Sequence, residues 1–298
     1  MKRSTPIATR LNLSSGMKEI RQQAWELNTG GRIPAPTPSQ GRSIMGKFVI
    51  KNSKIIINQY DLSSDHNSVE LSVTREEKDS TVLGAVGRNR LAGLQSFTFS
   101  GSGYFEASTG TGAQASRSKI DTVIQPAVGT SNAEITILPQ GSSAGSKGFF
   151  SQANIFEYSP GGSVGDILGF SFAGAGEGKA MVQGVVLSSS ALTASGTGTP
   201  FQLGAVQSHQ AMYAQLHVTE TSGTSPGLKV TIQSDPTSGF GTPTTRISFT
   251  TITSGLASEW KSLATTVSGA WWRTNVTTVG TGERFKAYVI AGQTNLYD

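Results

Sequence analysis

A period of two runs through the apolar residues of this chain and constrains its fold more than any other feature. Val69, Leu71 and Val73 alternate with polar neighbours, and the same spacing recurs at Phe97 and Phe99. This spacing places apolar side chains on one face of an extended strand, whereas a helix needs a period of about 3.6. Further alternating segments lie at 212–218, 228–232, 247–249 and 285–289. Many short strands at even spacing are typical of sandwiches, jelly rolls and barrels, so a mainly β fold is predicted.

The remaining elements follow from the same patterns. Further strands are expected at 133–138, 149–158, 166–173 and 180–187. One short helix is expected over 116–128, capped by Ser116, with apolar residues at Ile120, Val123 and Ile124 on one face. Residues 74–92 are rich in charge and contain glycine, so they are expected to form a long polar loop. Glycine supplies 36 of the 298 residues, well above the usual share of about 7%, which suits a fold with many tight turns.

Charge and composition divide the chain into four segments. Residues 1–45 hold seven Lys and Arg against two Glu, so this basic N-terminal arm accounts for the whole net charge of +5. A β domain is expected over 46–187, and a second β-sandwich, similar to a jelly roll, over 201–298. Residues 188–200 are rich in Ser, Thr and Gly and are expected to form the linker between them. Two interpretations of the arm stay open: an optional tail, or a segment that orders on a neighbouring subunit during assembly.

Composition also excludes several classes of function. The chain has no cysteine, which excludes disulfides and thiolate metal sites. No apolar run approaches the roughly 20 residues that span a bilayer, and no secretory signal is recognisable, so a soluble protein assembled in a cytoplasm is expected. The body after residue 45 is neutral on balance, whereas a fold that grips DNA shows a basic face. Charged residues make up only 14% of the chain, as is typical of surfaces that neighbouring subunits cover.

No arrangement of residues indicates an enzyme or a cofactor site. The Gly-rich stretch that ends at Lys179 lacks the hydroxyl residue that a phosphate loop needs, because Ala180 follows. His209 and His217 would lie far apart on a strand, and His217 is expected on a polar, solvated or interfacial face; His66 is likewise expected in a polar, solvated turn. We therefore expect no catalytic residues, no metal and no cofactor.

Several short phrases resemble one family. Asn58–Ser64 followed by Asn67–Ser72 resembles the strand, "DLS" turn and second strand that open the major tail tube proteins of long-tailed bacteriophages. Similar phrases are found at Arg90–Leu94, Phe97–Gly101 and Gly162–Asp166, and residues 230–250 are similar to an accessory β-sandwich appended to such proteins. The resemblance covers residues 46–292 and does not include the basic arm.

This resemblance implies a non-enzymatic structural protein of the virion tail. Such subunits join sheet edges into hexameric rings, and the rings stack into a tube through which DNA passes during genome ejection without specific binding. The implied partners are further copies of the chain and other tail proteins, with no membrane insertion. The segment 74–92 matches the loop through which rings stack, and its proposed stacking or lumen residues are Arg75, Glu76, Glu77, Lys78, Asp79, Arg88 and Arg90.

Two alternatives of other classes stay open. A capsid decoration protein or a head–tail connector has the same β architecture but remains a small oligomer. A host-surface glycan-binding module in the C-terminal domain needs an exposed aromatic side chain. Trp271 and Trp272 must face opposite sides of a strand, so one belongs to the core, and Trp271 is the candidate for the exposed one.

Overall fold

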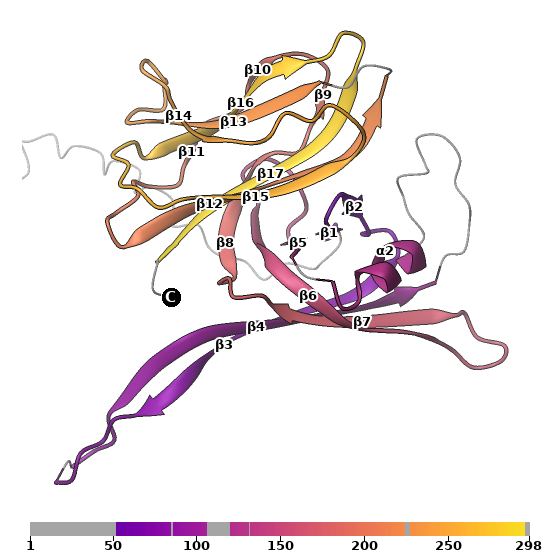
Figure 1. Cartoon of the computed structure of the whole chain (residues 1–298), viewed down its shortest axis with the longest axis vertical. Helices are drawn as coiled ribbons and strands as arrows, with labels where there is room; N and C mark the ends of the chain where they lie inside the picture. Colours follow the sequence, from indigo (N-terminus) through magenta and orange to yellow (C-terminus); the bar gives the residue numbers. More distant parts are fainter. Residues whose placement is uncertain (1–51, 85, 106–119, 131, 224–226, 296–298) are drawn as a thin grey trace, which may run out of the picture. The chain divides into compact units, whose positions relative to one another are not determined.

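The computed structural model describes residues 52–84, 86–105, 120–130, 132–223 and 227–295, so the basic arm predicted over 1–45 lies outside the described residues (Figure 1). Within these ranges the chain is mainly β, as predicted, with a single α-helix, α2, over Ile120–Ala127. The strands of the first half are β1 Lys54–Ile57, β2 Tyr60–Asp61, β3 His66–Asp79, β4 Arg90–Tyr104, β5 Ala133–Leu138, β6 Lys147–Gly161, β7 Gly169–Gly176 and β8 Val182–Ser188. Those that follow are β9 Ala191–Leu192, β10 Gly196–Thr197, β11 Phe201–Gln202, β12 Gln210–Ser222, β13 Leu228–Asp235, β14 Thr244–Ser248, β15 Ala257–Leu263, β16 Trp271–Val279 and β17 Arg284–Asn295.

The strands form two sheets with antiparallel pairing. The larger sheet has 12 strands, with β15, β12, β17, β8, β6, β5, β1 and β2 in spatial order and β3, β4, β7 and β9 attached to it. The smaller sheet has five strands and contains β10, β16, β13 and β14 in order, with β11 also paired to β16. The long strand β6 bends between two sets of partners: its first half pairs with β5 and β8, and its second half pairs with β7.

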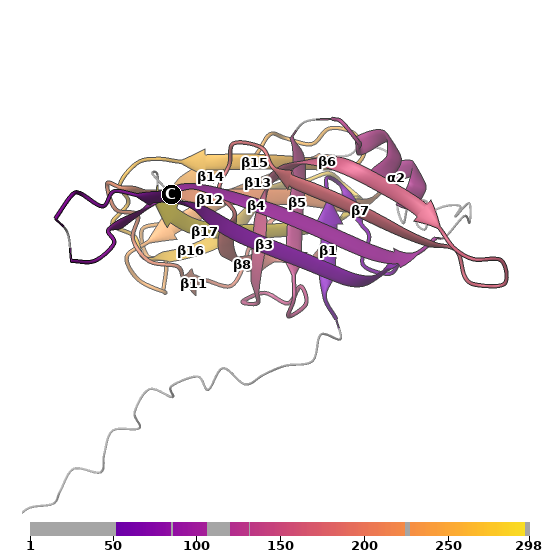
Figure 2. The same cartoon turned by 90° about the horizontal axis from the view of Figure 1, so that it is seen from below.

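The second half of β6 belongs to a four-stranded unit that we call the front sheet. It consists of β3, β4, β7 and residues 153–161 of β6, paired in that order (Figure 2). Its inner face is lined by Phe97, Phe99, Phe170 and Phe172, all of them buried, and α2 contributes apolar side chains to the same core. Its outer face carries the polar partners of the alternation. The front sheet is therefore a half-buried sheet of the kind that a period of two predicts.

Glycines on the inner face make room for these phenylalanines. Gly174 lies directly opposite Phe99 across β4 and β7, and Gly101 lies opposite Phe172. A Cβ atom on Gly174 would clash with the Phe99 ring, and one on Gly101 would clash with the Phe172 ring. Large rings over small neighbours fill the space between strands without voids, which is how a closely packed core is built.

Three apolar clusters form the core. One lies between the inner face of the front sheet, α2, β1 and β5. A second lies between β12 and β17 on one side and the smaller sheet on the other, and Trp272 is its largest buried side chain. The third is smaller and is built from Leu138, Phe150, Val182, Val186 and Ile290. The third cluster draws side chains from both halves of the chain, so β12 and β17 are packed on both faces.

A polar network accompanies the third cluster. The Thr136 hydroxyl lies 2.8 Å from the Gln215 amide oxygen and 2.8 Å from Nε2 of His217, while Nδ1 of His217 contacts the carbonyl oxygen of Asn58. The prediction of a solvated or interfacial histidine at position 217 is therefore wrong, because His217 is fully buried inside the subunit. Burial lowers the pKa of His217 to about 4, so the ring is neutral at neutral pH.

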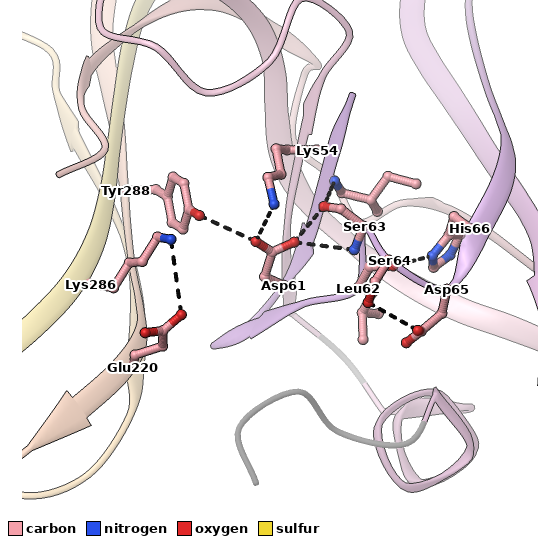
Figure 3. Close-up of polar contacts among 11 residues, drawn as sticks. Lys54, Asp61, Leu62, Ser63, Ser64, Asp65, His66, Glu220, Lys286 and Tyr288 are labelled. Atoms are coloured by element: carbon pink, nitrogen blue, oxygen red, sulfur yellow. Dashed lines mark hydrogen bonds and ion pairs between the residues drawn. The ribbon is translucent and has the colours of Figure 1, made fainter. Parts of the chain in front are cut away.

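A second set of polar contacts connects Asp61, at the end of β2, with β17. The carboxylate of Asp61 accepts hydrogen bonds from Lys54 at 2.8 Å, from the backbone N–H of Ser63 at 3.1 Å and from the Tyr288 hydroxyl at 3.2 Å (Figure 3). Burial raises the pKa of Asp61, but the bonds from Lys54 and Ser63 outweigh burial, so the pKa lies below its usual value. The "DLS" phrase of the sequence thus supplies a partly buried, ionised anchor.

His66 departs from the expectation of a solvated turn residue. It begins β3, and its ring packs edge-on against Phe170 and Phe172, with centroids 5.2 and 5.3 Å away. Its Nδ1 lies 2.6 Å from the carbonyl oxygen of Leu62, as Figure 3 also shows. The polar residues around His66 in the sequence predict a solvated turn. The aromatic partners of His66 come from β7, about a hundred residues further along the chain, so the local sequence does not reveal them.

The loop predicted over 74–92 is also wrong. β3 continues to Asp79 and β4 begins at Arg90, so the connection is limited to residues 80–89. The charged residues form strands here because they pair with each other, although they bury no face. The strands predicted over 133–138, 149–158, 166–173 and 180–187 correspond to β5, β6, β7 and β8, and the described part of the predicted helix is α2.

The segment 188–200, expected to be a linker, contains two short strands. β9 pairs with β17 and β10 pairs with β16. β17 also pairs with β8, so the larger sheet continues from the first half of the chain into the second. The division into domains at 46–187 and 201–298 stays a prediction. Strands from both of these parts belong to the larger sheet.

Candidate assembly surface

The most prominent feature of the front sheet is a two-stranded extension. β3 pairs with β4 as far as Asp79 and Arg90, but β7 accompanies β4 only from Thr98 onward. Residues 74–79 and 90–96, which we call the ribbon, therefore pair with each other alone (Figure 1). An isolated hairpin is marginally stable in water, because it has no face against which to bury its side chains. A ribbon of this kind gains stability when another surface covers it.

The end of the ribbon is closed by its own hydrogen bonds. The backbone N–H of Ser80 donates to the carbonyl of Asn89 at 2.9 Å, and the N–H of Thr81 donates to the Asp79 carboxylate at 2.9 Å. The Thr81 hydroxyl in turn accepts from the N–H of Asn89 at 2.9 Å. Hydrogen bonds from the side chain and the backbone of Thr81 hold the pKa of Asp79 below its usual value. We call residues 80–84 and 86–89 the ribbon tip.

The ribbon and its tip bring together the charged residues predicted to form the stacking site, namely Arg75, Glu76, Glu77, Lys78, Asp79, Arg88 and Arg90. Arg90 pairs with Glu77 at 2.7 Å, and Lys78 pairs with Glu76. These side chains are half exposed, so water screens the pairs and each contributes little to stability. These side chains instead offer exposed positive and negative charges with which a neighbouring copy can interact.

Exposed apolar side chains concentrate on the same sheet. In the described residues, every large hydrophobic side chain that is exposed lies between Val73 and Leu168. One group occupies the ribbon and its tip, at Val82, Leu83, Val86, Leu91 and Leu94, with Val73 at the base of the ribbon. Another group surrounds the β6–β7 turn, at Tyr104, Val164, Ile167 and Leu168. Exposed apolar groups gathered in this way mark interaction surfaces, whereas isolated ones need no explanation.

The outer face of the front sheet carries mostly small side chains, together with two acids and the exposed ring of Phe156. The small and acidic residues are Ser68, Glu70 and Ser72 on β3, Thr98, Ser100 and Ser102 on β4, Ser171, Ala173 and Ala175 on β7, and Glu157 and Ser159 on β6; Phe156 lies beside Glu157 at the bulge of β6. Both charged members, Glu70 and Glu157, are acidic and exposed. The alternation around Val69 already contained Glu70, but nothing in the sequence pattern joined it to Glu157.

The front sheet also has two free edges among the described residues. β3 pairs with β4 on one side and with no strand on the other. On β6, the pairing with β5 ends at Ala153, and one bridge from Val128 to Ile155 follows. Beyond Ile155 the edge that faces away from β7 is unpaired. Pro160 has no backbone N–H to donate, so a further strand can pair with this edge only as far as Ser159.

Trp271 lies apart from this surface, on β16 of the smaller sheet. Trp272 is fully buried and its indole N–H donates to the carbonyl of Gly204 at 2.8 Å, whereas Trp271 is partly exposed. The two rings do face opposite sides, as predicted. On the Trp271 side, Arg273 donates to the Gln233 amide at 3.1 Å and lies over the ring of Phe240.

The described residues contain no group of three or more His, Asp or Glu side chains placed to hold a metal ion. The described part of the chain also contains no helix with the length and hydrophobicity that crossing a bilayer requires.

The comparisons with known proteins found no matching family model and no similar curated protein. Among solved structures, the chain is similar to the virion of a native gene transfer agent particle, with 18% identity, 43% of this chain and 92% of that chain covered, and a TM-score of 0.31. It is similar to the tail of an empty gene transfer agent particle with C6 symmetry, with 20% identity, the same coverages and a TM-score of 0.32. It is also similar to the SPP1 Dit protein, described as a hub adsorption apparatus of phages that infect Gram-positive bacteria, with 10% identity, 82% of this chain and 100% of that chain covered, and a TM-score of 0.33.

Proposed function

We propose that the protein is the structural subunit of a phage tail tube, which forms hexameric rings that stack around a DNA-conducting channel. The observation that carries the proposal is the front sheet. Among the described residues it has two free edges, one buried face and one mostly polar face without a basic side chain. The proposal places the protein in the tail of the virion, after assembly in the host cytoplasm, with other tail proteins at the ends of the tube.

The free edges support lateral assembly. The outer edge of β3 in one copy can pair with residues 156–159 of β6 in the next, which adds a strand to each sheet and satisfies backbone groups that water otherwise covers. This contact joins two different surfaces, so repeated copies either close into a ring or continue as a helix. A four-stranded sheet that joins its neighbours in this way becomes a barrel whose wall is continuous.

The polar face supports a channel lining. Because the inner face is filled by phenylalanines, α2 and β1, the outer face is the one that a barrel of front sheets can turn to its lumen. Its small hydroxyl side chains leave room, and Glu70 and Glu157 repel phosphate groups. DNA that meets no basic side chain releases no counterions on contact, so it passes without being held.

The ribbon supports the stacking of rings. It extends beyond the last residue that β7 covers, and it presents apolar and charged groups of both signs to its surroundings. Covering these apolar groups by the next ring gains hydrophobic free energy at about 25 cal/mol per Å² of buried apolar area. A structural role of this kind requires no catalytic residues and no cofactor.

Negative-stain electron microscopy of the purified full-length chain tests the proposal. The expected result is hollow filaments of regular width without nucleic acid. Small closed oligomers that bind capsids would instead indicate a decoration protein, and a chain that remains monomeric at high concentration contradicts the proposal.

The charges of the ribbon can be tested in the same assay. Replacing Glu76, Glu77 and Asp79 by their amides is expected to reduce the number and length of filaments at low salt, where interactions between exposed charges are least screened. Unchanged assembly would remove these acids from the interface and leave the apolar side chains as its main component.

A glycan-binding role of the C-terminal half is the second candidate. The partly exposed ring of Trp271 lies beside Arg273 and Gln233, and an aromatic face with planar polar neighbours is suited to a sugar ring. Reduced adsorption of virions that carry Trp271→Ala, with filament assembly unchanged, is the expected result. Normal adsorption together with a silent glycan array contradicts this role.

A further inference from the structure

The two groups of exposed apolar side chains lie at opposite ends of one sheet. At one end of the front sheet Asp79 is paired with Arg90, next to the ribbon tip. At the other end Tyr104 is paired with Gly169, next to the β6–β7 turn, whose residues 162–168 we call the turn patch. Because β4 runs without interruption from Arg90 to Tyr104, the strand direction itself separates the two groups.

Both groups are held in place by hydrogen bonds. The ribbon tip is closed by Ser80, Thr81 and Asn89, as described above. In the turn patch the N–H of Asp166 donates to the carbonyl of Ser163 at 3.0 Å, and Gly165 adopts a φ of +97° that favours glycine. The N–H of Phe105 donates to the carbonyl of Leu168 at 2.8 Å and attaches the turn to the end of β4. Preformed surfaces lose little conformational entropy when they bind.

We infer that the ribbon tip of one copy docks on the turn patch of a copy in the next ring, so that rings stack head to tail along the direction of the front-sheet strands. This inference rests on the proposed function and names the partner of the ribbon. A contact between opposite ends of the same element is heterologous, and repetition along an axis produces an open filament.

Three observations favour a second copy of this chain as the occupant. Leu83 and Val86 at the tip are fully exposed, as is Val164 in the turn patch, so each side offers the apolar area that the other needs. The charges are complementary, because the tip carries Arg88 and the turn patch carries Asp166, both exposed. No large exposed hydrophobic side chain lies in the described residues from 169 onward, so the C-terminal half offers no comparable apolar surface.

The absence of cysteine from the chain makes a cross-linking test unusually specific. The variant that carries Leu83→Cys and Val164→Cys is assembled into filaments and treated with a short bis-maleimide. Since the two positions lie at opposite ends of the front sheet, a link between them joins different copies. The expected result on a denaturing gel is a ladder from dimers to high multiples. The control variant pairs Leu83→Cys with Thr277→Cys, an exposed position on β16, and should give no ladder.

The outcomes separate the inference from the proposed function. Filaments that form without a ladder contradict head-to-tail docking and leave the tube function standing. A wild-type chain that forms no filaments contradicts the tube function itself.

Two further variants cover the case in which the cysteine variant does not assemble. Leu83→Asp and Val164→Asp are each expected to stop elongation while leaving the thermal unfolding midpoint unchanged, and Thr277→Asp should elongate normally. Normal elongation by either of the first two variants overturns the inference.

Discussion

At the scale of the residue, His217 in the buried polar network makes the stability of the protein depend on pH. His217 has a pKa of about 4 in the folded protein, against an ordinary value of 6.5, because burial disfavours the charged ring. The fold therefore favours the neutral ring. The stability that this preference contributes is fully present above pH about 6.5 and is lost as the pH falls toward 4. A lowering of this size corresponds to about 3 kcal/mol.

The first prediction follows from this sign. The free energy of unfolding is expected to fall between pH 6.5 and 4, by up to about 3 kcal/mol from His217 alone. In His217→Gln the fall should be smaller by that amount, because the amide does not titrate and can still meet the Thr136 hydroxyl. Urea unfolding at several pH values measures the difference.

The matched control for this prediction is His209→Gln, which makes the same substitution at an exposed position. His66 and Glu259, whose pKa values also lie below their usual values, add the same acid-induced loss to every variant, so only the difference between variants counts. Identical slopes for His217→Gln and the wild type would contradict the assignment.

A second prediction concerns the glycines under the phenylalanines. Gly174→Ala is expected to destabilise the subunit by about 1–3 kcal/mol, because its Cβ would clash with the Asn154 carbonyl and the Phe99 ring. The control is Gly161→Ala, where a Cβ meets nothing within 4 Å and should cost far less. Equal stability of the two variants in urea unfolding would show that the front sheet is less closely packed than described.

Elements were predictable where they bury one face. The alternation at Phe97 and Phe99 indicates a strand, because the core imposes a period of two on it. The ribbon shows the limit of this signal. Its residues 74–79 bury no face, so charged side chains replace the alternation and the pattern indicates a loop. The hydrogen bonds that make it a strand come from residues 90–96, and only pairing reveals them.

The candidate site was predictable in part for the same reason. The charged residues from Arg75 to Arg90 were identified as a group because they are adjacent in the sequence. The outer face of the front sheet was not, since Glu70 and Glu157 are 87 positions apart and meet only through β4 and β7. The sequence pattern predicts a solvent-exposed His217 because polar residues alternate with apolar ones along its strand. This strand is packed on both faces, and a polar residue that faces a second buried layer has the same pattern as one that faces water.

At the scale of the whole molecule, the larger sheet joins the two halves of the chain. β17 pairs with β8 and β12, and Tyr288 on β17 reaches Asp61 in the opening turn. The C-terminal half is therefore fixed to the front half by backbone pairing as well as by side chains. In a tube, this arrangement holds the smaller sheet at a constant position relative to the channel wall, where it can decorate the outside or meet other components.

The whole-molecule prediction concerns the passage of DNA. Thr98→Lys together with Ser100→Lys adds two positive charges to the outer face of the front sheet, beside Glu70. If this face lines the channel, the filaments should retain short double-stranded DNA that nucleases cannot reach, and the retention should fall steeply with salt as phosphate contacts release counterions. Nuclease protection followed by gel analysis measures it at several salt concentrations.

The control places the same charge elsewhere: Ser248→Lys together with Thr277→Lys adds two lysines at exposed positions of the smaller sheet. Both proteins then have the same net charge, so any difference in protected DNA reports where the charge lies. DNA bound by the control should remain open to nuclease, because that surface faces away from a channel formed by front sheets. Protection by the control and not by the front-sheet variant would place the smaller sheet at the lumen and reverse the orientation of the subunit in the wall.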